Sequence, residues 1–422
     1  MNVKEIPTIQ TENADETKSS LGRKALIFLM VIAFLNTMGM TIVLPVVPFM
    51  TLKHLGNPNN LALVVSWLTA SYAICQLIAA PGLGLLSDRF GRKSILLICL
   101  LGSAVGYLLF GLGNSLLILF LGRIIDGLTG GNFSVLFGYI ADITKPGERG
   151  KYFGMVGGAS GVGLMLGPAI GGLLANISYS MPFLVATGVI LLNIAWGFFF
   201  LPESLSQENR LKTIRMRDLN PLKQMSDVFK LANLRWFLLA GFFYAFPFAM
   251  FQSTWTILMK DCLGWNPTQA GLIATTAGVV DIVVQGLLVG ILITIFGDVK
   301  LSIVALIVVA ISYLLLGSVA LIASPIPLIS GVILFAGAGG LVENALRGLI
   351  SRMVGPGEQG RVAGANQSVE SLALILGPLF GGIAYTQWGH FQTYGAGAFI
   401  IVLAIVSVLV AVPALHRHDA AI

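Results

Sequence analysis

The segment Pro146-Gly147-Glu148-Arg149-Gly150-Lys151 recurs as Pro356-Gly357-Glu358-Gln359-Gly360-Arg361, 210 residues later. The same offset relates Gly167-Pro168-Ala169-Ile170-Gly171-Gly172 to Gly377-Pro378-Leu379-Phe380-Gly381-Gly382. Further pairs at this offset are Asp88 and Asp298, Gly127 and Gly337, and Gly130 and Gly340. Matches of this density at one offset indicate that the chain is built from two copies of one unit.

The sequence around these repeats is strongly apolar. Of the 422 residues, 56% are hydrophobic and 10% are charged, and the mean hydropathy is +0.88, whereas soluble domains carry about 25% charged residues. Such a chain lacks the polar surface of a soluble protein, and its composition excludes a disordered or nucleic-acid-binding chain. Three cysteines are too few for a disulfide scaffold.

Long stretches without Asp, Glu, Lys or Arg, divided by turn residues, predict twelve membrane-spanning helices of about 20 residues or more. In lipid, every backbone polar group must be satisfied within its segment, which favours helices, and the alternating pattern of a membrane β-barrel is absent. The predicted limits are 25–50, 61–86, 94–112, 116–140, 151–174, 182–201, 236–259, 267–295, 301–323, 327–350, 361–384 and 392–413.

The predicted fold class is therefore an all-α integral membrane protein with two pseudo-symmetric six-helix bundles. Repeats of this kind are related by an axis along the membrane normal, with the substrate site between them near mid-membrane. The expected parts are a tail at 1–24, bundles at 25–201 and 236–413, a linker at 202–235 and a second tail at 414–422.

The basic residues predict the orientation, because cytoplasmic segments carry an excess of Lys and Arg. Of the 25 basic residues, 21 fall in the two tails, the linker and the loops on that same side. Only Lys53 and Lys260 fall on the other side, and Arg123 and Arg347 fall within predicted helices. We expect both termini and the linker to be cytoplasmic, so the net charge of +6 reports topology rather than an anionic partner.

A polar loop, Gly84-Leu85-Leu86-Ser87-Asp88-Arg89-Phe90-Gly91-Arg92-Lys93, joins the second and third predicted helices. Asp88 can cap a helix N-terminus, and Arg92 can offer a fork of N–H groups to a carboxylate, for which Asp142 is the candidate. In the second copy, Gly297-Asp298-Val299-Lys300 keeps the aspartate and lacks the arginine. The alternative is that the basic residues only obey the charge rule and the glycines only turn the chain.

The fifth predicted helix contains glycines spaced for close helix packing and a proline that bends the helix. The residues are Gly163, Gly167, Pro168, Gly171 and Gly172. A bent, tightly packed helix can close one face of the site between two bundles that rock against each other. The alternative is generic packing of small residues, which the recurrence of the pattern in the eleventh helix also fits. Leu201-Pro202-Glu203-Ser204 marks the end of the sixth helix and predicts a boundary more than chemistry.

These motifs resemble the major facilitator superfamily. The 84–93 loop matches the G-x-L-a-D-r-x-G-r-k loop of that family, and Leu121-Gly122-Arg123-Ile124-Ile125-Asp126-Gly127 is similar to its R-x-x-x-G motif. The resemblance implies a cytoplasmic latch made by Gly84, Asp88, Arg89, Gly91, Arg92, Lys93 and Asp142. The fifth-helix motif is similar to that of drug/proton antiporters and is rare in symporters.

Across the whole chain the resemblance is nearest to bacterial tetracycline exporters and their multidrug relatives, and the N-terminal half carries most of it. Supporting strings are Asn36-Thr37-Met38-Gly39-Met40, Leu44-Pro45-Val46-Val47-Pro48 and Ile140-Ala141-Asp142-Ile143-Thr144. Tetracycline exporters have aspartates where this chain has Asn36 and Gly106, and a third in the ninth helix, which has no acid here. Tetracycline is therefore not the predicted substrate.

Acids within predicted helices are the candidates for proton coupling, because charge in lipid is costly. Arg123 and Asp126 share a helix face, as do Glu343 and Arg347, so these pairs are either proton-responsive or static. Asp281 and Glu370 have no obvious helical partner apart from Gln285 beside Asp281. Burial of an acid without a partner favours its protonated form, which makes Glu370 the first candidate and Asp281 the second. Alternatively, these two acids only select cationic substrates.

An apolar, aromatic substrate cavity is expected. Candidate lining residues are Phe34, Asn36, Met40, Phe133, Tyr244, Phe248, Phe251, Gln252, Trp255 and Gln285. Some of these aromatic residues are also expected to face lipid.

The predicted function is proton-coupled efflux of lipophilic small molecules by alternating access, in the cytoplasmic membrane of a bacterium. The expected partners are the substrate, protons and the bilayer, with no nucleic acid, and the functional unit is expected to be a monomer. No cofactor or metal is expected, because the four histidines lack ligand spacing and no Cys–His pair is visible. The chain has no ATP-binding G-x-x-x-x-G-K-S/T segment. The alternatives are an enzyme, a proton-linked uptake symporter or a lipid flippase of the same fold.

Overall fold

The computed structural model describes residues 26–27, 29–144, 148–211, 234–354 and 359–419. Within these ranges the chain is almost entirely α-helical and contains no strand. The predicted tail at 1–24 and most of the predicted linker lie outside the described residues.

The first half of the described chain follows the predicted helices, except that the first predicted span (25–50) is interrupted at 43–46 and the fourth is divided. Its helices are Leu29–Ile42, α2 (Val47–Leu52), α3 (Leu61–Phe90), α4 (Arg92–Leu112), α5 (Leu116–Thr129), α6 (Asn132–Ile143), α7 (Arg149–Leu174) and α8 (Met181–Phe200). The fourth predicted span is divided at Gly130 into α5 and α6. The side-chain amide of Gln76 donates to the Gly130 carbonyl at 2.9 Å, which satisfies a backbone group left free by this break.

The second half contains α10 (Arg235–Leu263), α11 (Pro267–Val283), a π-helical turn η4 (Val284–Leu288), α12 (Val289–Ile322), α13 (Pro325–Arg352), α14 (Gln359–Gln387) and α15 (His390–Asp419). The segment from α11 to α12 is continuous but changes direction at Gly297, whose φ of 72° favours glycine. This is the predicted boundary between the eighth and ninth spans.

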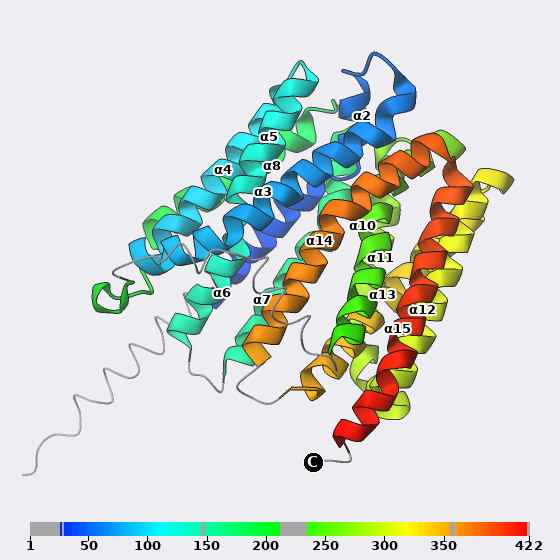
Figure 1. Cartoon of the computed structure of the whole chain (residues 1–422). Coiled ribbons are helices and arrows are strands. Elements are labelled where there is room, and N and C mark those ends of the chain that lie inside the picture. Colours follow the sequence, from blue (N-terminus) through cyan, green and yellow to red (C-terminus); the bar gives the residue numbers. More distant parts are fainter. Residues whose placement is uncertain (1–25, 28, 145–147, 212–233, 355–358, 420–422) are drawn as a thin grey trace, which may run out of the picture.

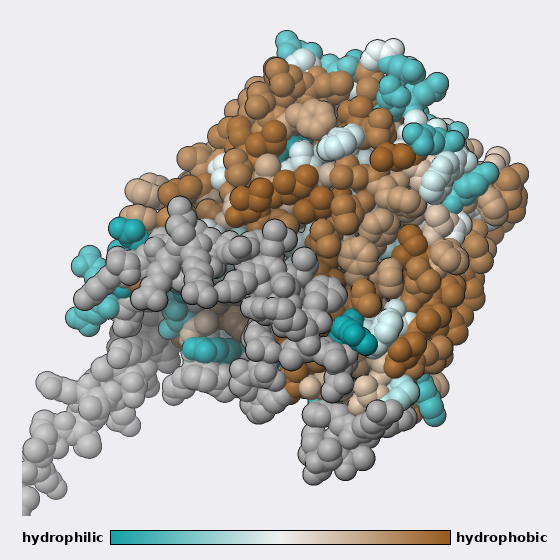
Figure 2. All heavy atoms as spheres, viewed as in Figure 1, coloured by the Kyte–Doolittle hydropathy of each residue, from teal (hydrophilic) through white to brown (hydrophobic). Residues whose placement is uncertain are grey.

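Ten helices among the described residues are long and apolar enough to cross a membrane. That number treats Pro267–Ile322 as one helix and leaves out Leu29–Ile42, which is shorter. Hydrophobic residues cover the broad face of the molecule and hydrophilic residues gather toward its ends (Figure 2). These features describe a multi-pass membrane protein, and the count of twelve crossings stays a prediction.

The helices of the first half gather on one side of the molecule and those of the second half on the other (Figure 1). The two sets meet where α7 packs on α11 and α3 packs on α14. We call the end that carries Lys53 and Lys260 the Lys53 end, and the end that carries Arg92 and Arg352 the Arg92 end.

The two halves are packed together at the Lys53 end. Thr268 on α11 donates to the Gly172 carbonyl on α7 at 2.8 Å, and a β-carbon added at Gly172 would lie 2.6 Å from the carbonyl oxygen of Pro267. Further along α7, a β-carbon added at Gly161 would lie 3.8 Å from the side chain of Ile282 on α11. Beyond this point β-carbons added at the remaining glycines of α7 (Gly150, Gly154, Gly157 and Gly158) would meet no described atom within 4 Å, so this part of the helix is open at its glycines.

The repeated glycine motif explains both the packing within each half and the contact between them. In α7, Gly163, Gly167 and Gly171 lie against the helix Leu29–Ile42, whereas Gly172 lies against α11. The second copy behaves in the same way: Gly377 and Gly381 lie against α10, and Gly382 lies against Ser66 of α3. Each copy therefore holds its own bundle together and also touches the opposite one.

Candidate functional site

A cavity of about 480 Å³ lies between the two halves. The first half contributes only apolar residues to its wall, namely Leu44, Leu164 and Pro168. All the charged lining residues come from the second half: Asp281, Glu343, Arg347 and Glu370. With three acids and one base, the lining favours a positively charged or neutral ligand over an anion.

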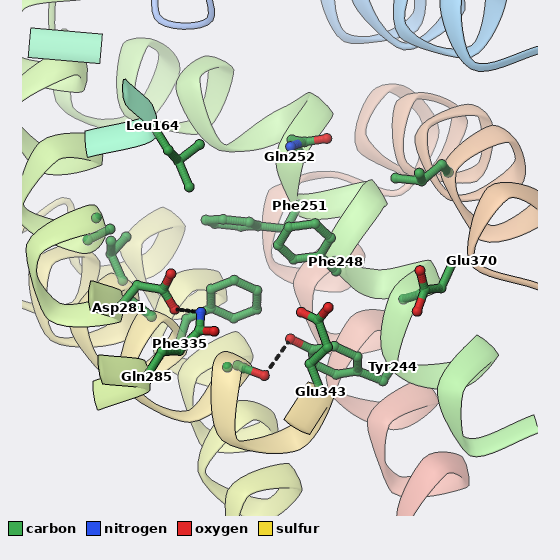
Figure 3. Close-up of a pocket in the computed structure, with 18 of the residues that line it drawn as sticks. Leu164, Tyr244, Phe248, Phe251, Gln252, Asp281, Gln285, Phe335, Glu343 and Glu370 are labelled. Atoms are coloured by element: carbon green, nitrogen blue, oxygen red, sulfur yellow. Dashed lines mark hydrogen bonds between the residues drawn. The ribbon is translucent and has the colours of Figure 1, made fainter. Parts of the chain in front are cut away.

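Aromatic side chains form the middle of this cavity (Figure 3). Phe335 of α13 lies parallel to Phe248 of α10 with ring centroids 5.8 Å apart, and it contacts Phe251 at 4.8 Å. Trp255 continues the aromatic surface at 5.9 Å from Phe251. Such rings offer flat apolar area and can also bind cations over their faces.

Two clusters of polar side chains lie beside the aromatic rings (Figure 3). On α11 and η4, the amide of Gln285 donates to Asp281 at 2.7 Å. On α13 and α14, Arg347 pairs with Glu343 at 2.6 Å, the ion pair expected from their spacing, and lies 3.7 Å from Glu370. The expectation that Glu370 has no partner is wrong, because the packing of α13 on α14 brings Arg347 within reach.

Glu370 has a second partner on its own helix. The side-chain amide of Asn366, one turn earlier, donates to its carboxylate at 2.7 Å. Asn366 and Phe335 both line the cavity and were absent from the sequence-based candidates. The position of Asn366 one helical turn before Glu370 could have indicated this contact, whereas nothing in the sequence distinguishes Phe335 from the lipid-facing aromatic residues.

The remaining coupling candidate lies away from the cavity. Asp126 is buried inside the first bundle, 3.8 Å from Arg123, as expected from their spacing. The guanidinium of Arg123 also lies over the rings of Tyr72 and Phe110, at 5.7 and 5.5 Å. Asp126 is therefore part of the packing between helices of the first bundle and does not line the cavity.

Of the residues predicted to bind substrate, some line the cavity and others lie away from it. Tyr244, Phe248, Phe251, Gln252, Trp255 and Gln285 line the cavity, whereas Phe34, Asn36 and Met40 do not. Asn36 instead accepts a hydrogen bond from Asn132 at 3.1 Å. The side chain of Phe133 lies outside the described residues.

The packing around Gly106 leaves no space for the aspartate that tetracycline exporters have at this position. Its backbone packs on α5 so closely that an added β-carbon would lie 2.7 Å from the Gly122 carbonyl oxygen and 2.8 Å from Asp126 Cβ. An aspartate cannot enter this position unless α4 and α5 separate.

Arg92 is the centre of an ionic cluster at the Arg92 end. Its guanidinium contacts Asp88 at 2.6 Å and Asp142 at 3.1 Å, and it donates to Ser87 at 2.7 Å. The contact with Asp142 is the predicted one. Asp88 does not cap α4, because the backbone N–H of Arg92 donates to Glu203 instead, at 2.8 Å.

The second copy of this cluster does have an arginine, contrary to the sequence-based expectation. Asp298 lies 3.5 Å from Arg352, and Arg352 occupies the position that corresponds to Asp142 at the offset of 210 residues. In the first copy the arginine lies at the start of the helix after the loop, whereas in the second copy it lies at the end of α13. The sequence of the second loop alone therefore does not reveal it.

A Cys–His pair is present at the Lys53 end, although none was expected. Cys262 Sγ lies 3.3 Å from Nδ1 of His390, while the other nitrogen of that ring faces Asp261 at 4.0 Å. Because the sulfur and the carboxylate lie on opposite sides of the imidazole, they cannot bind one metal ion together with it. Among the described residues no group of three or more His, Cys, Asp or Glu is arranged to hold a metal.

Comparison with known proteins gives the family. A model described as "Major Facilitator Superfamily" matches residues 29–254 and 237–421. The class H tetracycline resistance protein of Pasteurella multocida is 32% identical over 86% of this chain and 89% of its own length. Multidrug resistance protein 2 of Bacillus subtilis (strain 168) is 31% identical over 91% of this chain and 95% of its own length.

A solved structure shows the same fold. The human organic anion transporter MFSD10 (TETRAN) superposes with a TM-score of 0.70 at 24% identity, covering 92% of this chain and 99% of the other. The helical architecture, the cavity between two sets of helices and the matches along the sequence lead to one conclusion: the chain belongs to the Major Facilitator Superfamily.

Proposed function

We propose that this chain is a proton-coupled exporter of lipophilic small molecules, preferably cations. The observation that carries this proposal is the apolar, aromatic cavity with three carboxylates and one arginine between the two halves. Relatives named as tetracycline and multidrug resistance proteins support efflux as the direction. The antiporter-type glycine motif of α7 supports exchange with protons rather than symport.

The expected movement is a rocking of the bundles 25–201 and 236–413 around the cavity. In the described conformation the halves are packed at the Lys53 end, and the glycines of α7 toward the Arg92 end have open space around them. With the termini and the linker (202–235) on the cytoplasmic side, this conformation opens inward. We propose a monomer in the bacterial cytoplasmic membrane, with short cytoplasmic tails at 1–24 and 414–422.

Glu370 and Asp281 are the proposed proton carriers, and Arg347 links the first of them to Glu343. Protonation of Glu370 removes the negative charge that faces Arg347, which leaves the arginine to Glu343 alone. A cationic substrate and a proton then compete for the same negative charge in the cavity. By linkage each must weaken the binding of the other, which is the condition for exchange.

The substrate is not expected to be tetracycline. Asn36 is hydrogen-bonded to Asn132 rather than directed into the cavity, and Gly106 has no space for an acid. A flat lipophilic cation, by contrast, can lie among Phe248, Phe251 and Phe335 with its charge toward the acids.

The experiment is transport by purified protein in liposomes with an imposed pH gradient, using lipophilic cationic dyes, neutral antibiotics and a fluorescent lipid. Cationic dyes should move against the direction of proton flow, and dissipation of the gradient should abolish their accumulation. Flux that ignores the gradient would contradict proton coupling. Dye movement in the same direction as protons would indicate a symporter, and movement of the lipid alone would indicate a flippase.

A further inference from the structure

Residues 202–211 cross the Arg92 end of the first bundle as a strap, outside the predicted helices. The strap is bonded to α6 near its start and to α3 at its end. The Tyr139 hydroxyl of α6 donates to the Pro202 carbonyl, Ser204 donates to Asp142 at 3.0 Å, and the Leu211 N–H donates to the Asp88 carbonyl at 2.9 Å. The strap is therefore fastened at both of its ends.

Glu203 forms the centre of the strap. One carboxylate oxygen accepts three backbone N–H groups, from Arg92 at 2.8 Å, Ser204 at 3.1 Å and Leu205 at 3.2 Å. The Arg92 N–H is the first of helix α4, where a negative charge is favoured by the helix dipole and by unpaired donors. Glu203 thus serves as the cap that the sequence assigned to Asp88.

The path of the chain at Gly91 permits this cap. Gly91 has a φ of 104°, a conformation that favours glycine. A β-carbon at this position would also collide with the Glu203 carboxylate. The glycine is therefore needed both for its backbone angle and for the space that it leaves to Glu203.

The strap fixes Arg92 from two directions. Glu203 holds its backbone, while Ser204 donates to the same oxygen of Asp142 that Arg92 Nε contacts at 3.1 Å. The hydrogen bonds of Ser204 and Glu203 thereby limit where the guanidinium and its acidic partner can lie relative to Asp88.

We propose that Glu203 and Ser204 are positioning residues of the Arg92 cluster, and that the strap transmits the position of the linker to that cluster. The proposal rests on the proposed function insofar as the cluster acts as a cytoplasmic latch. Leu211, the last described residue of the strap, is fastened beside Asp88, so the strap ends next to the cluster rather than at the end of α8. Relative movement of the halves then reaches Arg92 through the strap.

The first test is dye efflux by Glu203→Gln, which keeps the size of the side chain and removes its charge. Loss of a charged cap should lower the maximal rate by about fivefold and leave KM for the dye unchanged, because the cavity is untouched. Glu203→Asp should recover part of the rate. Glu208→Gln, at an exposed acid of the same strap, is the matched control and should behave as the wild type.

A double-variant comparison separates positioning from a merely structural role. If Glu203 acts through Arg92 and Asp142, then Glu203→Gln should have little further effect in an Asp142→Asn background. Independent effects, in which the two losses multiply, would overturn the proposal. So would a wild-type rate in Glu203→Gln or a change confined to KM.

A readout that does not depend on transport is limited trypsin digestion of the purified full-length chain, followed by mass spectrometry. The Arg210–Leu211 bond lies between the fastened ends of the strap, so Glu203→Gln should accelerate cleavage there severalfold relative to cleavage after Lys230. Unchanged cleavage would overturn the strap. If the wild type transports none of the dyes, the proposed function fails while this digestion still tests whether Glu203 holds the strap.

Discussion

Arg347 on α13 lies 3.7 Å from Glu370 on α14 while it remains paired with Glu343 at 2.6 Å. One guanidinium therefore faces two carboxylates in the wall of the cavity. Glu343 and Arg347 keep 44% and 56% of their side-chain surface exposed and Glu370 keeps 25%, so Glu370 is the more enclosed acid of the two. The arrangement predicts different roles for the two acids.

Glu370→Gln should uncouple transport from the proton gradient. A coupling free energy between proton and substrate of about 1–3 kcal/mol corresponds to a factor of roughly 5 to 150, and its loss should lower gradient-driven accumulation by that factor. Exchange of labelled for unlabelled dye at equal pH should persist. The measurement is dye accumulation and dye exchange in the same liposomes, with Asp281→Asn examined in parallel. Normal gradient-driven transport in both variants would contradict the assignment of these two acids.

Arg347→Gln should reduce transport more than it reduces stability. The pair is more than a third exposed, so its contribution to the free energy of unfolding is about 1 kcal/mol or less. Its loss, however, leaves two carboxylates facing one another without the neutralising charge. Thermal unfolding in detergent and dye efflux together check this, and Glu343→Gln combined with Arg347→Gln should recover part of the efflux. A large drop in melting temperature with unchanged efflux would contradict it.

Bulky residues at two glycines of α7 should affect opposite ends of the molecule. Gly172→Val places a side chain against the Pro267 carbonyl and should prevent the halves from packing at the Lys53 end. The β-carbon of Gly158→Val would meet no described atom within 4 Å in this conformation, so the variant should leave the described packing intact and obstruct closure at the Arg92 end.

The check is labelling of a cysteine at Leu164, in the cavity wall, by a water-soluble maleimide applied from either side, with Cys75, Cys99 and Cys262 replaced. Gly172→Val should increase labelling from the Lys53 side, and Gly158→Val should increase labelling from the Arg92 side. Equal effects of both variants on the two sides would contradict a rocking movement.

Gly106→Asp should destabilise the protein, whereas Asn36→Asp should be tolerated. The first places atoms against the Gly122 carbonyl and Asp126, and overpacking of this kind costs about 1–3 kcal/mol. The second replaces one acceptor of the Asn132 hydrogen bond by another. The amount of folded protein in the membrane and its melting temperature measure the difference. Normal accumulation of Gly106→Asp would show that α4 and α5 separate easily.

The helices and the contacts within them could be predicted from the sequence, because lipid requires each segment to satisfy its own backbone and because helical spacing brings Glu343 to Arg347. Contacts between helices could be predicted only where a motif carries them, as for Arg92 and Asp142. Arg347 reaches Glu370, and Glu203 reaches Arg92 across 111 residues, only through the rotation and relative height of neighbouring helices. Apolar helix surfaces contain little information about those two quantities, so these two contacts had to come from the structure.

The division of the cavity wall has an electrostatic consequence for the movement itself. Leu44, Leu164 and Pro168, which represent the first half, make no ion pair across the cavity, and the charged groups travel together on the second half. At the cavity the halves can then move past one another without pulling opposite charges apart in a medium of low dielectric constant. At the Lys53 end the same movement has to break hydrogen bonds such as the one from Thr268 to Gly172. Reorientation therefore does not require any charged group of the cavity lining to give up an ion partner on the first half.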